Sequence, residues 1–311
     1  MKIKYLTAGI IALCIISGYI LYLRIKSIKN NNGKPFHVVC TTTILGDAIK
    51  AITLDSINID ILIRPGVDPH TYKPIEPDML KIAKADLIIY HGLHLEARIS
   101  DLFAHLKHSK QTLAATECIA KNKLICTNQE CSMYDPHVWL HPLLWIEVVD
   151  NIAKKLGELI PHQKDTYIHN AQIFIRKIQQ MYQSTLEKSK KILPEKRVLI
   201  TSHDAFSYFA QAYNFETMSL QGINTATQTG FADITAVVNF IIKYKIPTIF
   251  IESSIPAKTM HAIQERVQNL GMKINIGDEL YSDSLSISSG PAATYLDMID
   301  YNLNTIINGL T

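Results

Sequence analysis

The sequence predicts an α/β protein in which two βα lobes with parallel sheets are joined by one long, rigid helix. Short β-branched runs alternate with amphipathic segments beyond Pro35, which is typical of βα units. This alternation gives way at Pro161 and restarts at Arg197, with a helical stretch between the two series. We therefore expect four parts: an N-terminal segment 1–35, a first lobe 36–160, a connector helix 161–194 and a second lobe 195–311.

The first lobe is expected to contain three strand and helix pairs. Each predicted strand is a short run rich in Val, Ile or Leu, and each predicted helix has apolar residues at helical spacing. The pairs are strand 37–40 with helix 45–52, strand 57–63 with helix 78–83, and strand 87–90 with helix 95–106.

The connector is predicted from about thirty residues, 162–192, that contain neither Gly nor Pro. Prolines flank this stretch on both sides, and apolar residues recur within it at intervals of three to five. A surface helix within a single domain is the alternative, but a position between two βα series favours a connector. The recurring apolar residues are Tyr167, Ala171, Phe174, Ile178, Met181 and Leu186.

The second lobe repeats the same alternation after residue 195. Four apolar runs are expected to be strands, and three amphipathic segments between them are expected to be helices. The strands are 197–201, 216–220, 248–251 and 273–276, and the helices are 205–213, 233–244 and 257–270.

The N-terminal segment differs in composition from the remainder. Residues 1–35 contain six bases and no acid around an apolar stretch, 5–23, close to the ~20 residues that cross a bilayer. We expect an extracytoplasmic protein tethered by this stretch, with a cleaved signal peptide as the alternative. The other 25 of the 31 Lys and Arg face 28 acids, so a mildly acidic body without a basic stripe predicts no nucleic-acid partner.

Three cysteines, Cys118, Cys126 and Cys131, lie in one stretch that resembles a loop, and Cys40 lies in an apolar run. An oxidising compartment would permit one disulfide there, for example between Cys126 and Cys131. Free thiols are an equally weighted alternative.

Four short clusters place a histidine or a carboxylate in a turn after an apolar run. Two of them are the same Asp-Pro-His tripeptide, in which proline stiffens the turn. Ligands of open α/β sheets bind at the carboxyl ends of strands, and three of the clusters follow predicted strands. Three imidazoles and one carboxylate suit zinc or manganese, so the candidate ligands are His70, His137, His203 and Asp283.

Other histidines fit this set less well. His141 follows His137 by four residues, but Pro136 and Pro142 argue against one continuous helix, and its role stays open. His91 and His94, with His105 and His108, resemble a cluster. We expect the last two to lie on a polar helical face and to bind no metal.

Six ordered motifs then indicate a family. They are Arg64-Pro-Gly-Val-Asp-Pro-His-Thr-Tyr, Asp135-Pro-His-Val-Trp-Leu, Thr201-Ser-His-Asp-Ala-Phe-Ser-Tyr-Phe, Leu220-Gln-Gly-Ile-Asn, Phe250-Ile-Glu-Ser-Ser and Leu280-Tyr-Ser-Asp-Ser-Leu. Over residues 36–311 the chain resembles the TroA-like metal-binding receptors of bacterial zinc and manganese ABC transporters. The resemblance implies a metal site in the cleft between the lobes, with His70, His137, His203 and Asp283 as ligands. It also implies delivery to an integral-membrane ABC permease, and we expect a monomer.

The chain departs from the family pattern at informative positions. His141 stands where the family usually has Asp or Asn, and residues 107–134 lack the His-rich loop of zinc-dedicated relatives. His203 stands where manganese-dedicated relatives usually have glutamate. We therefore expect Zn²⁺ or Mn²⁺ as bound cargo, with Fe²⁺ left open.

Further residues are expected to support the ligands. Glu252 and Asp204 are candidates to orient the imidazoles through their other ring nitrogen, although Asp204 could instead cap a helix. Four aromatic residues could form a dry wall of the site or belong to the ordinary core. They are Trp139, Tyr72, Phe206 and Tyr208.

A site closed by four protein ligands leaves no position for a substrate, so we expect capture and delivery of a metal and no catalysis. The alternative is an exported zinc hydrolase with three protein ligands and a water. The sequence contains no HExxH, P-loop or Gly-x-Ser-x-Gly motif for such an enzyme. A third possibility is a structural or adhesive protein that the metal stiffens.

Overall fold

The computed structural model describes residues 34–107, 109–226 and 230–311, and residues from His37 to Thr311 form one compact unit. The predicted N-terminal anchor lies outside the described residues except for its last two positions. Within the part of the chain that is described, no helix is both long and apolar enough to cross a bilayer.

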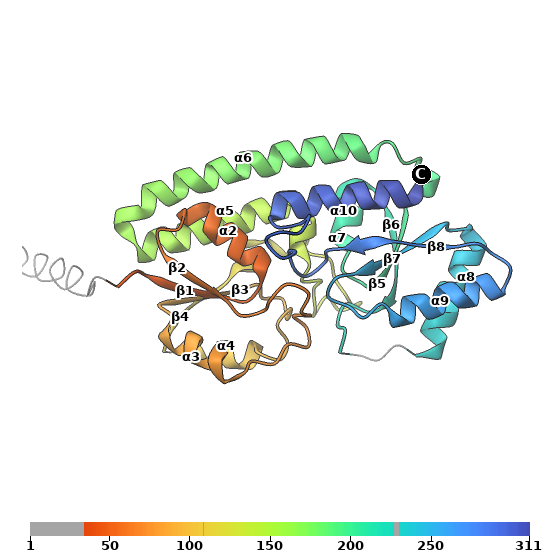
Figure 1. The fold of residues 1–311 in the computed structure, drawn as a ribbon. Coiled ribbons are helices and arrows are strands. Elements are labelled where there is room, and N and C mark those ends of the chain that lie inside the picture. The colour runs from red at the N-terminus through yellow and green to blue at the C-terminus, as the bar shows by residue number, and fades with distance from the viewer. Residues whose placement is uncertain (1–33, 108, 227–229) are drawn as a thin grey trace, which may run out of the picture. The chain divides into compact units, whose positions relative to one another are not determined.

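The first sheet has four parallel strands in the order β2-β1-β3-β4 (Figure 1). The two central strands are buried along their whole length, as expected for a parallel sheet covered on both faces. Strand β4 was not predicted from the sequence, and its first three residues are only partly buried or exposed. The strands are β1 (His37–Cys40), β2 (Asn58–Ile61), β3 (Leu87–Tyr90) and β4 (Gln111–Ala114).

Helices cover both faces of this sheet. Helices α3 (Glu76–Lys84) and α4 (Ser100–Leu106) lie on one face, and α2 (Thr43–Thr53) and α5 (Pro142–Leu159) lie on the other (Figure 1). The sequence reading missed α5. This helix begins at Pro142, whose fixed φ and missing N–H suit a first helical position.

Helix α6 (Lys164–Ser189) is the predicted long helix, and it runs beside α5, α2 and α10 (Tyr295–Leu310) (Figure 1). Its buried face includes Tyr167, Phe174 and Ile178 from the recurring apolar set, whereas Met181 and Leu186 of that set are only partly buried. Helix α10 was not predicted, although its buried residues recur at helical spacing.

The second lobe contains two parallel strand pairs, β5 with β6 and β7 with β8. Two of the helices of this lobe, α8 and α9, pack with the strands around one apolar core that includes Ile200, Val238, Ile249 and Ile263. The strands are β5 (Val198–His203), β6 (Glu216–Gln221), β7 (Thr248–Glu252) and β8 (Asn275–Leu280), and the helices are α7 (Ser207–Tyr213), α8 (Phe231–Tyr244) and α9 (Lys258–Asn269). The predicted α/β class with parallel sheets and one long helix is confirmed.

Two of the four described cysteines are paired, since Cys126 and Cys131 form a disulfide. Cys40 is a buried free thiol and Cys118 is an exposed one. The structure therefore contains the pairing that the sequence left open.

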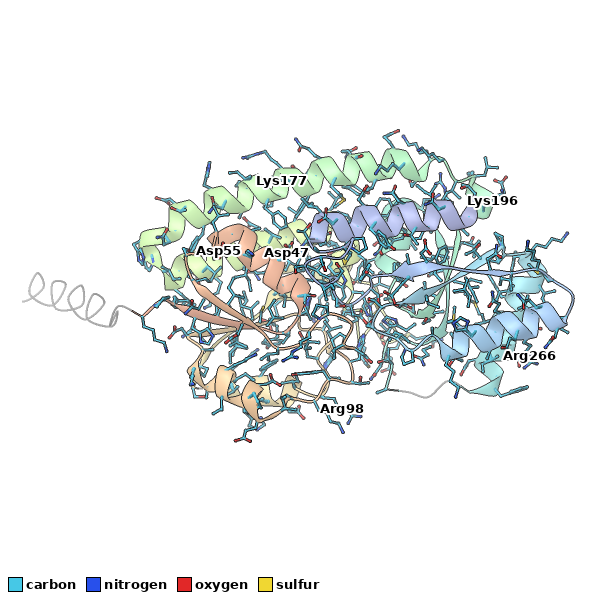
Figure 2. The ribbon with its side chains drawn as sticks, viewed as in Figure 1. Asp47, Asp55, Arg98, Lys177, Lys196 and Arg266 are labelled. Atoms are coloured by element: carbon cyan, nitrogen blue, oxygen red, sulfur yellow. A yellow bond between two sulfur atoms is a disulfide. The ribbon has the colours of Figure 1, made fainter. Side chains whose placement is uncertain are left out.

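The long helix offers a matched pair of isoleucines for a stability test. Ile178 is fully buried, whereas Ile173 is 37% exposed. Lys177, which is labelled in Figure 2, is an exposed residue of the same helix. We expect Ile178→Ala to lower the free energy of unfolding by about 2–5 kcal/mol, because it leaves a cavity. Ile173→Ala should cost under about 1 kcal/mol. Urea denaturation measures both, and equal losses would show that this face of α6 carries no special packing.

Candidate metal centre

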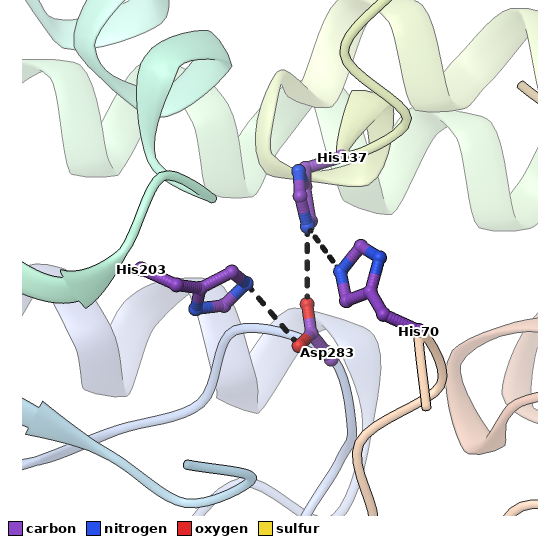
Figure 3. Close-up of side chains that lie close together, drawn as sticks. All are labelled: His70, His137, His203 and Asp283. Carbon is purple, nitrogen blue, oxygen red and sulfur yellow. Dashed lines mark hydrogen bonds and ion pairs between the residues drawn. The ribbon is translucent and has the colours of Figure 1, made fainter. Parts of the chain in front are cut away.

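Four side chains that are far apart in sequence converge at one buried point: His70, His137, His203 and Asp283 (Figure 3). Each offers one donor atom, and all four donor atoms lie within 4.8 Å of one another. None of the four residues is more than 2% exposed. The structure thus brings together the whole set named from the sequence.

The fold explains this convergence. His203 is the last residue of β5, and Asp283 follows the end of β8 by three positions. His70 lies in the loop after β2, and His137 precedes a short 3-10 helix, η3 (Val138–Leu140). The strand-end placement of three donors agrees with the general rule for open α/β sheets.

The donor atoms have spacings that fit one small metal ion. The Nε2 atoms of His70 and His137 are 3.2 Å apart, and the Nε2 atom of His137 is 3.4 Å from Asp283 Oδ1. The Nε2 atom of His203 is 3.4 Å from Asp283 Oδ2. A tetrahedral ion with bonds of ~2.1 Å separates its ligands by about 3.4 Å.

The same donors are short of hydrogen bonds. Among the described residues, His203 Nε2 and Asp283 Oδ1 are buried atoms that form no hydrogen bond and have only the ion-pair contacts at 3.4 Å. Buried polar atoms are rarely left in this way, because the lost hydration is costly. A cation between these atoms would satisfy both, so the donor set fits a divalent metal.

Both Asp-Pro-His turns are built in the same way. The carboxylate of Asp68 accepts the backbone N–H of His70 at 2.8 Å, and that of Asp135 accepts the N–H of His137 at 2.9 Å. Such side-chain to backbone bonds stabilise the turn and fix the backbone position of the histidine. The tripeptide is therefore a repeated structural unit that presents an imidazole.

Two carboxylates orient the rings. The Oδ1 atom of Asp135 lies 2.7 Å from Nδ1 of His137, and the Oε2 atom of Glu252 lies 2.7 Å from Nδ1 of His203. Glu252 also accepts the backbone N–H of His203 at 2.9 Å. Because Nδ1 is held in each case, Nε2 is the nitrogen that faces the centre.

Of the two predicted orienting residues, only Glu252 contacts a ligand side chain in this way. Asp204 instead accepts the hydroxyl of Ser207, the first residue of α7, at 3.0 Å. It does not cap that helix either, because the N-cap is Phe206 and no side chain bonds the first N–H groups of α7. Sequence reasoning did not assign the orienting role to Asp135. The sequence feature that could have indicated this role is the position of Asp135 in the same Asp-Pro-His tripeptide as the ligand His137.

The segment that carries Asp283 is held by contacts from several elements. The hydroxyl of Ser254 donates to Asp283 Oδ2 at 3.2 Å, and the indole of Trp139 donates to the carbonyl of Ser282 at 2.7 Å. The side-chain amide of Asn302 pairs with both backbone groups of Tyr281. The carboxylate therefore sits on a fixed backbone.

The electrostatics of the centre are dominated by burial and by these close charges. Burial lowers the pKa of His70 to about 4. Burial opposes the charged form of His137 as well, but Asp135 and Asp283 raise its pKa to about 9. In the same way Glu252 and Asp283 outweigh burial and raise the pKa of His203 well above its usual value.

Burial alone would raise the pKa of Asp283, yet His203 and His137 hold it well below its usual value. Without a metal, the centre therefore contains an ionised carboxylate between two imidazolium rings. A dication could replace the two Nε2 protons without changing the net charge of the site.

The predicted aromatic wall is only partly formed at the centre. Trp139 is fully buried and packs edge-on against His137, with 5.3 Å between ring centroids. Phe206 and Tyr208 are also fully buried. Tyr72 turns away and donates its hydroxyl to Asp78 at 2.5 Å.

His141 and His91 lie outside the group of four. His141 precedes α5, and its ring centroid is 6.3 Å from that of Tyr182. His91 is fully buried, contacts the hydroxyl of Thr42 at 2.8 Å and packs against Trp139. Burial lowers the pKa of His91 to about 3, so it stays neutral in the core.

The chain is similar over most of its length to known metal-binding proteins. The chain is 36% identical over 279 residues to the zinc-binding protein TroA of Treponema pallidum, with 90% of each chain covered. The solved structure of the periplasmic zinc-binding protein TroA superposes with a TM-score of 0.86, covering 89% of this chain and 99% of that one.

Two further relatives carry other metals in their names. The manganese-binding lipoprotein MntA of Bacillus subtilis is 35% identical over 273 residues, with 88% of this chain and 89% of that protein covered. The iron-binding protein YfeA of Yersinia pestis is 31% identical over 280 residues, with 90% and 88% covered. The family model described as zinc-uptake complex component A, periplasmic, matches residues 38–309, and the chain therefore belongs to this ZnuA family.

Proposed function

We propose that this protein captures a divalent transition metal outside the cytoplasm and delivers it to an integral-membrane ABC permease. The observation that carries the proposal is a buried set of three imidazoles and one carboxylate with metal-like spacings. Four protein donors close a tetrahedral site and leave no position for a reacting water. This arrangement suits the binding of a metal better than it suits hydrolysis. We therefore propose that the protein is not an enzyme.

The proposed cargo is Zn²⁺ or Mn²⁺, with Fe²⁺ as a further candidate. Imidazole nitrogens suit zinc and iron, whereas a carboxylate also accepts manganese, so the donor set does not select one ion by itself. Relatives named for zinc, manganese and iron are similar to the chain to comparable degrees.

Release is proposed to occur by separation of the two lobes, residues 36–160 and 195–311, with 161–194 as connector. Loop 64–71 meets the second lobe through Gly66, whose N–H donates to the Ser284 hydroxyl at 3.0 Å, and through Asp68, which accepts the Thr225 hydroxyl at 2.6 Å. His203 and Asp283 would then part from His70 and His137. This separation requires these two contacts to break, together with those of Trp139 to Ser282 and of Tyr208 to Asp135.

The remaining expectations concern the setting of the protein. We propose that it acts as a monomer and that the apolar stretch 5–23 tethers it to the outer face of the cytoplasmic membrane. The disulfide between Cys126 and Cys131 supports an oxidising compartment.

Removal of single donors tests the ligand set. We expect His70→Ala and Asp283→Asn each to weaken Zn²⁺ binding by more than about 100-fold, because each removes a direct ligand. His105→Ala is the matched control, since that ring is exposed and contacts only the Asp101 carbonyl of its own helix among the described residues. Competition with a chromophoric chelator measures the Kd, and unchanged binding in either donor variant would overturn the four-ligand assignment.

The raised pKa values predict proton release. Since His137, with a pKa of about 9, and His203 are both charged at pH 7 without metal, binding should expel about two protons per ion. Affinity should therefore fall as the pH is lowered, because protons compete for both nitrogens. Calorimetry in buffers of different ionisation enthalpy counts these protons, and binding without proton release would contradict the charge assignment.

Glu252 offers a test of ring orientation. We expect Glu252→Gln to weaken metal binding by about 10- to 100-fold, because the amide braces the His203 ring less strongly than the carboxylate does. Asp204→Asn is the control, since its carboxylate bonds Ser207 and does not contact the ring. Equal Kd values for the two variants would show that Glu252 does not orient the His203 ring.

A further inference from the structure

A short exposed hairpin leads directly into the second Asp-Pro-His turn. Ile125 and Asp135 form its base, where the N–H of Asp135 donates to the carbonyl of Ile125 at 2.9 Å. Residues 126–133 between them are all exposed, so the hairpin has almost no apolar core of its own. Something other than burial must therefore hold it closed.

Covalent and backbone bonds supply that closure. Cys126 and Cys131 form the disulfide, and Cys126 also pairs with Tyr134 in an antiparallel bridge. The N–H of Thr127 donates to the carbonyl of Met133 at 3.0 Å. Cys131 adopts a φ of 47°, a left-handed conformation that costs energy for residues other than glycine, and the disulfide restrains the chain there.

One hydroxyl then fastens the base of the hairpin to the second lobe. Tyr208 Oη accepts the N–H of Ile125 at 3.0 Å and donates to the carbonyl of Asp135 at 3.1 Å. Tyr208 is fully buried on α7, which begins four residues after the ligand His203. The two ends of the hairpin are thus held at one point beside the metal centre.

Asp135 transmits this restraint to the metal ligand. Its backbone belongs to the base of the hairpin, and its side chain holds both the backbone N–H and the Nδ1 atom of His137. Asp135 therefore links the restrained base directly to the His137 ring, whose Nε2 atom faces the centre. A shift of the hairpin base would move that nitrogen directly.

We propose that the disulfide-closed hairpin and Tyr208, together the hairpin clamp, position His137 and thereby slow metal loss. The clamp comprises residues 125–135 and the Tyr208 hydroxyl. This inference rests on the proposed function, since it concerns how long the same site retains its cargo. Its members are positioning residues, because they reach the metal only through Asp135 and His137.

The test uses the full chain in mild detergent, loaded with Co²⁺, whose visible absorption reports ligand geometry. Three proteins are compared with the wild type: the double variant Cys126→Ser with Cys131→Ser, Tyr208→Phe, and the control Cys118→Ser. Cys118 is an exposed free thiol outside the clamp. Mixing with excess EDTA gives the dissociation rate, and thermal unfolding without metal checks that each variant folds.

We expect the double cysteine variant and Tyr208→Phe each to lose Co²⁺ about 10-fold faster than the wild type, with a shifted absorption spectrum. Cys118→Ser should match the wild type in both measurements. A folded double cysteine variant with wild-type rate and spectrum overturns the inference, whatever Tyr208→Phe does. If the wild type itself binds no Co²⁺, the proposed function fails and the inference fails with it. If the wild type binds Co²⁺ and the variants release it at the same rate, only the inference fails.

Discussion

The buried carboxylate of Asp283, held between imidazoles, is the interaction on which the rest of the centre depends. A carboxylate that is 1% exposed is costly unless opposite charge and hydrogen bonds compensate for its lost hydration. His137 and His203 supply the charge, and Ser254 supplies a hydrogen bond. Because the two histidines come from different parts of the chain, this compensation holds only when those parts are together.

Residues around the four donors hold the imidazole rings and the Asp283 backbone in place. Asp135 and Glu252 each hold the far nitrogen of one ring, so that Nε2 faces Asp283 in both cases. Trp139 and Asn302 fix the backbone of the two residues that precede the carboxylate, Ser282 and Tyr281. A metal ion that replaced the two Nε2 protons would keep the charge balance and tighten the geometry, which is why we regard this site as suited to reversible loading.

The sequence named the four side chains that lie together in the structure, but it missed some of the elements around them. His70, His137 and His203 could be named because each stands next to an acid or at a strand end. Both features can be recognised from the neighbouring sequence alone. Strand β4 and helices α5 and α10 were missed. In β4 only one of four residues is buried, so its pairing with β3 decides its structure more than its own pattern does.

Some roles could not be predicted because they depend on distant contacts. Glu252 and Asp204 were both candidates in the sequence, with helix capping favoured for Asp204. Only the packing of β7 beside β5 placed Glu252 against the His203 ring. The clamp formed by Tyr208 joins residues that are 83 and 73 positions apart, which no local pattern reveals.

X-ray absorption spectroscopy of the zinc-loaded full chain tests the central claim most directly. The account predicts a first shell of three imidazole nitrogens and carboxylate oxygen at ~2.0–2.2 Å, with no sulfur. A first shell that contained sulfur, or one that consisted mainly of water oxygens with fewer than three imidazoles, would contradict it.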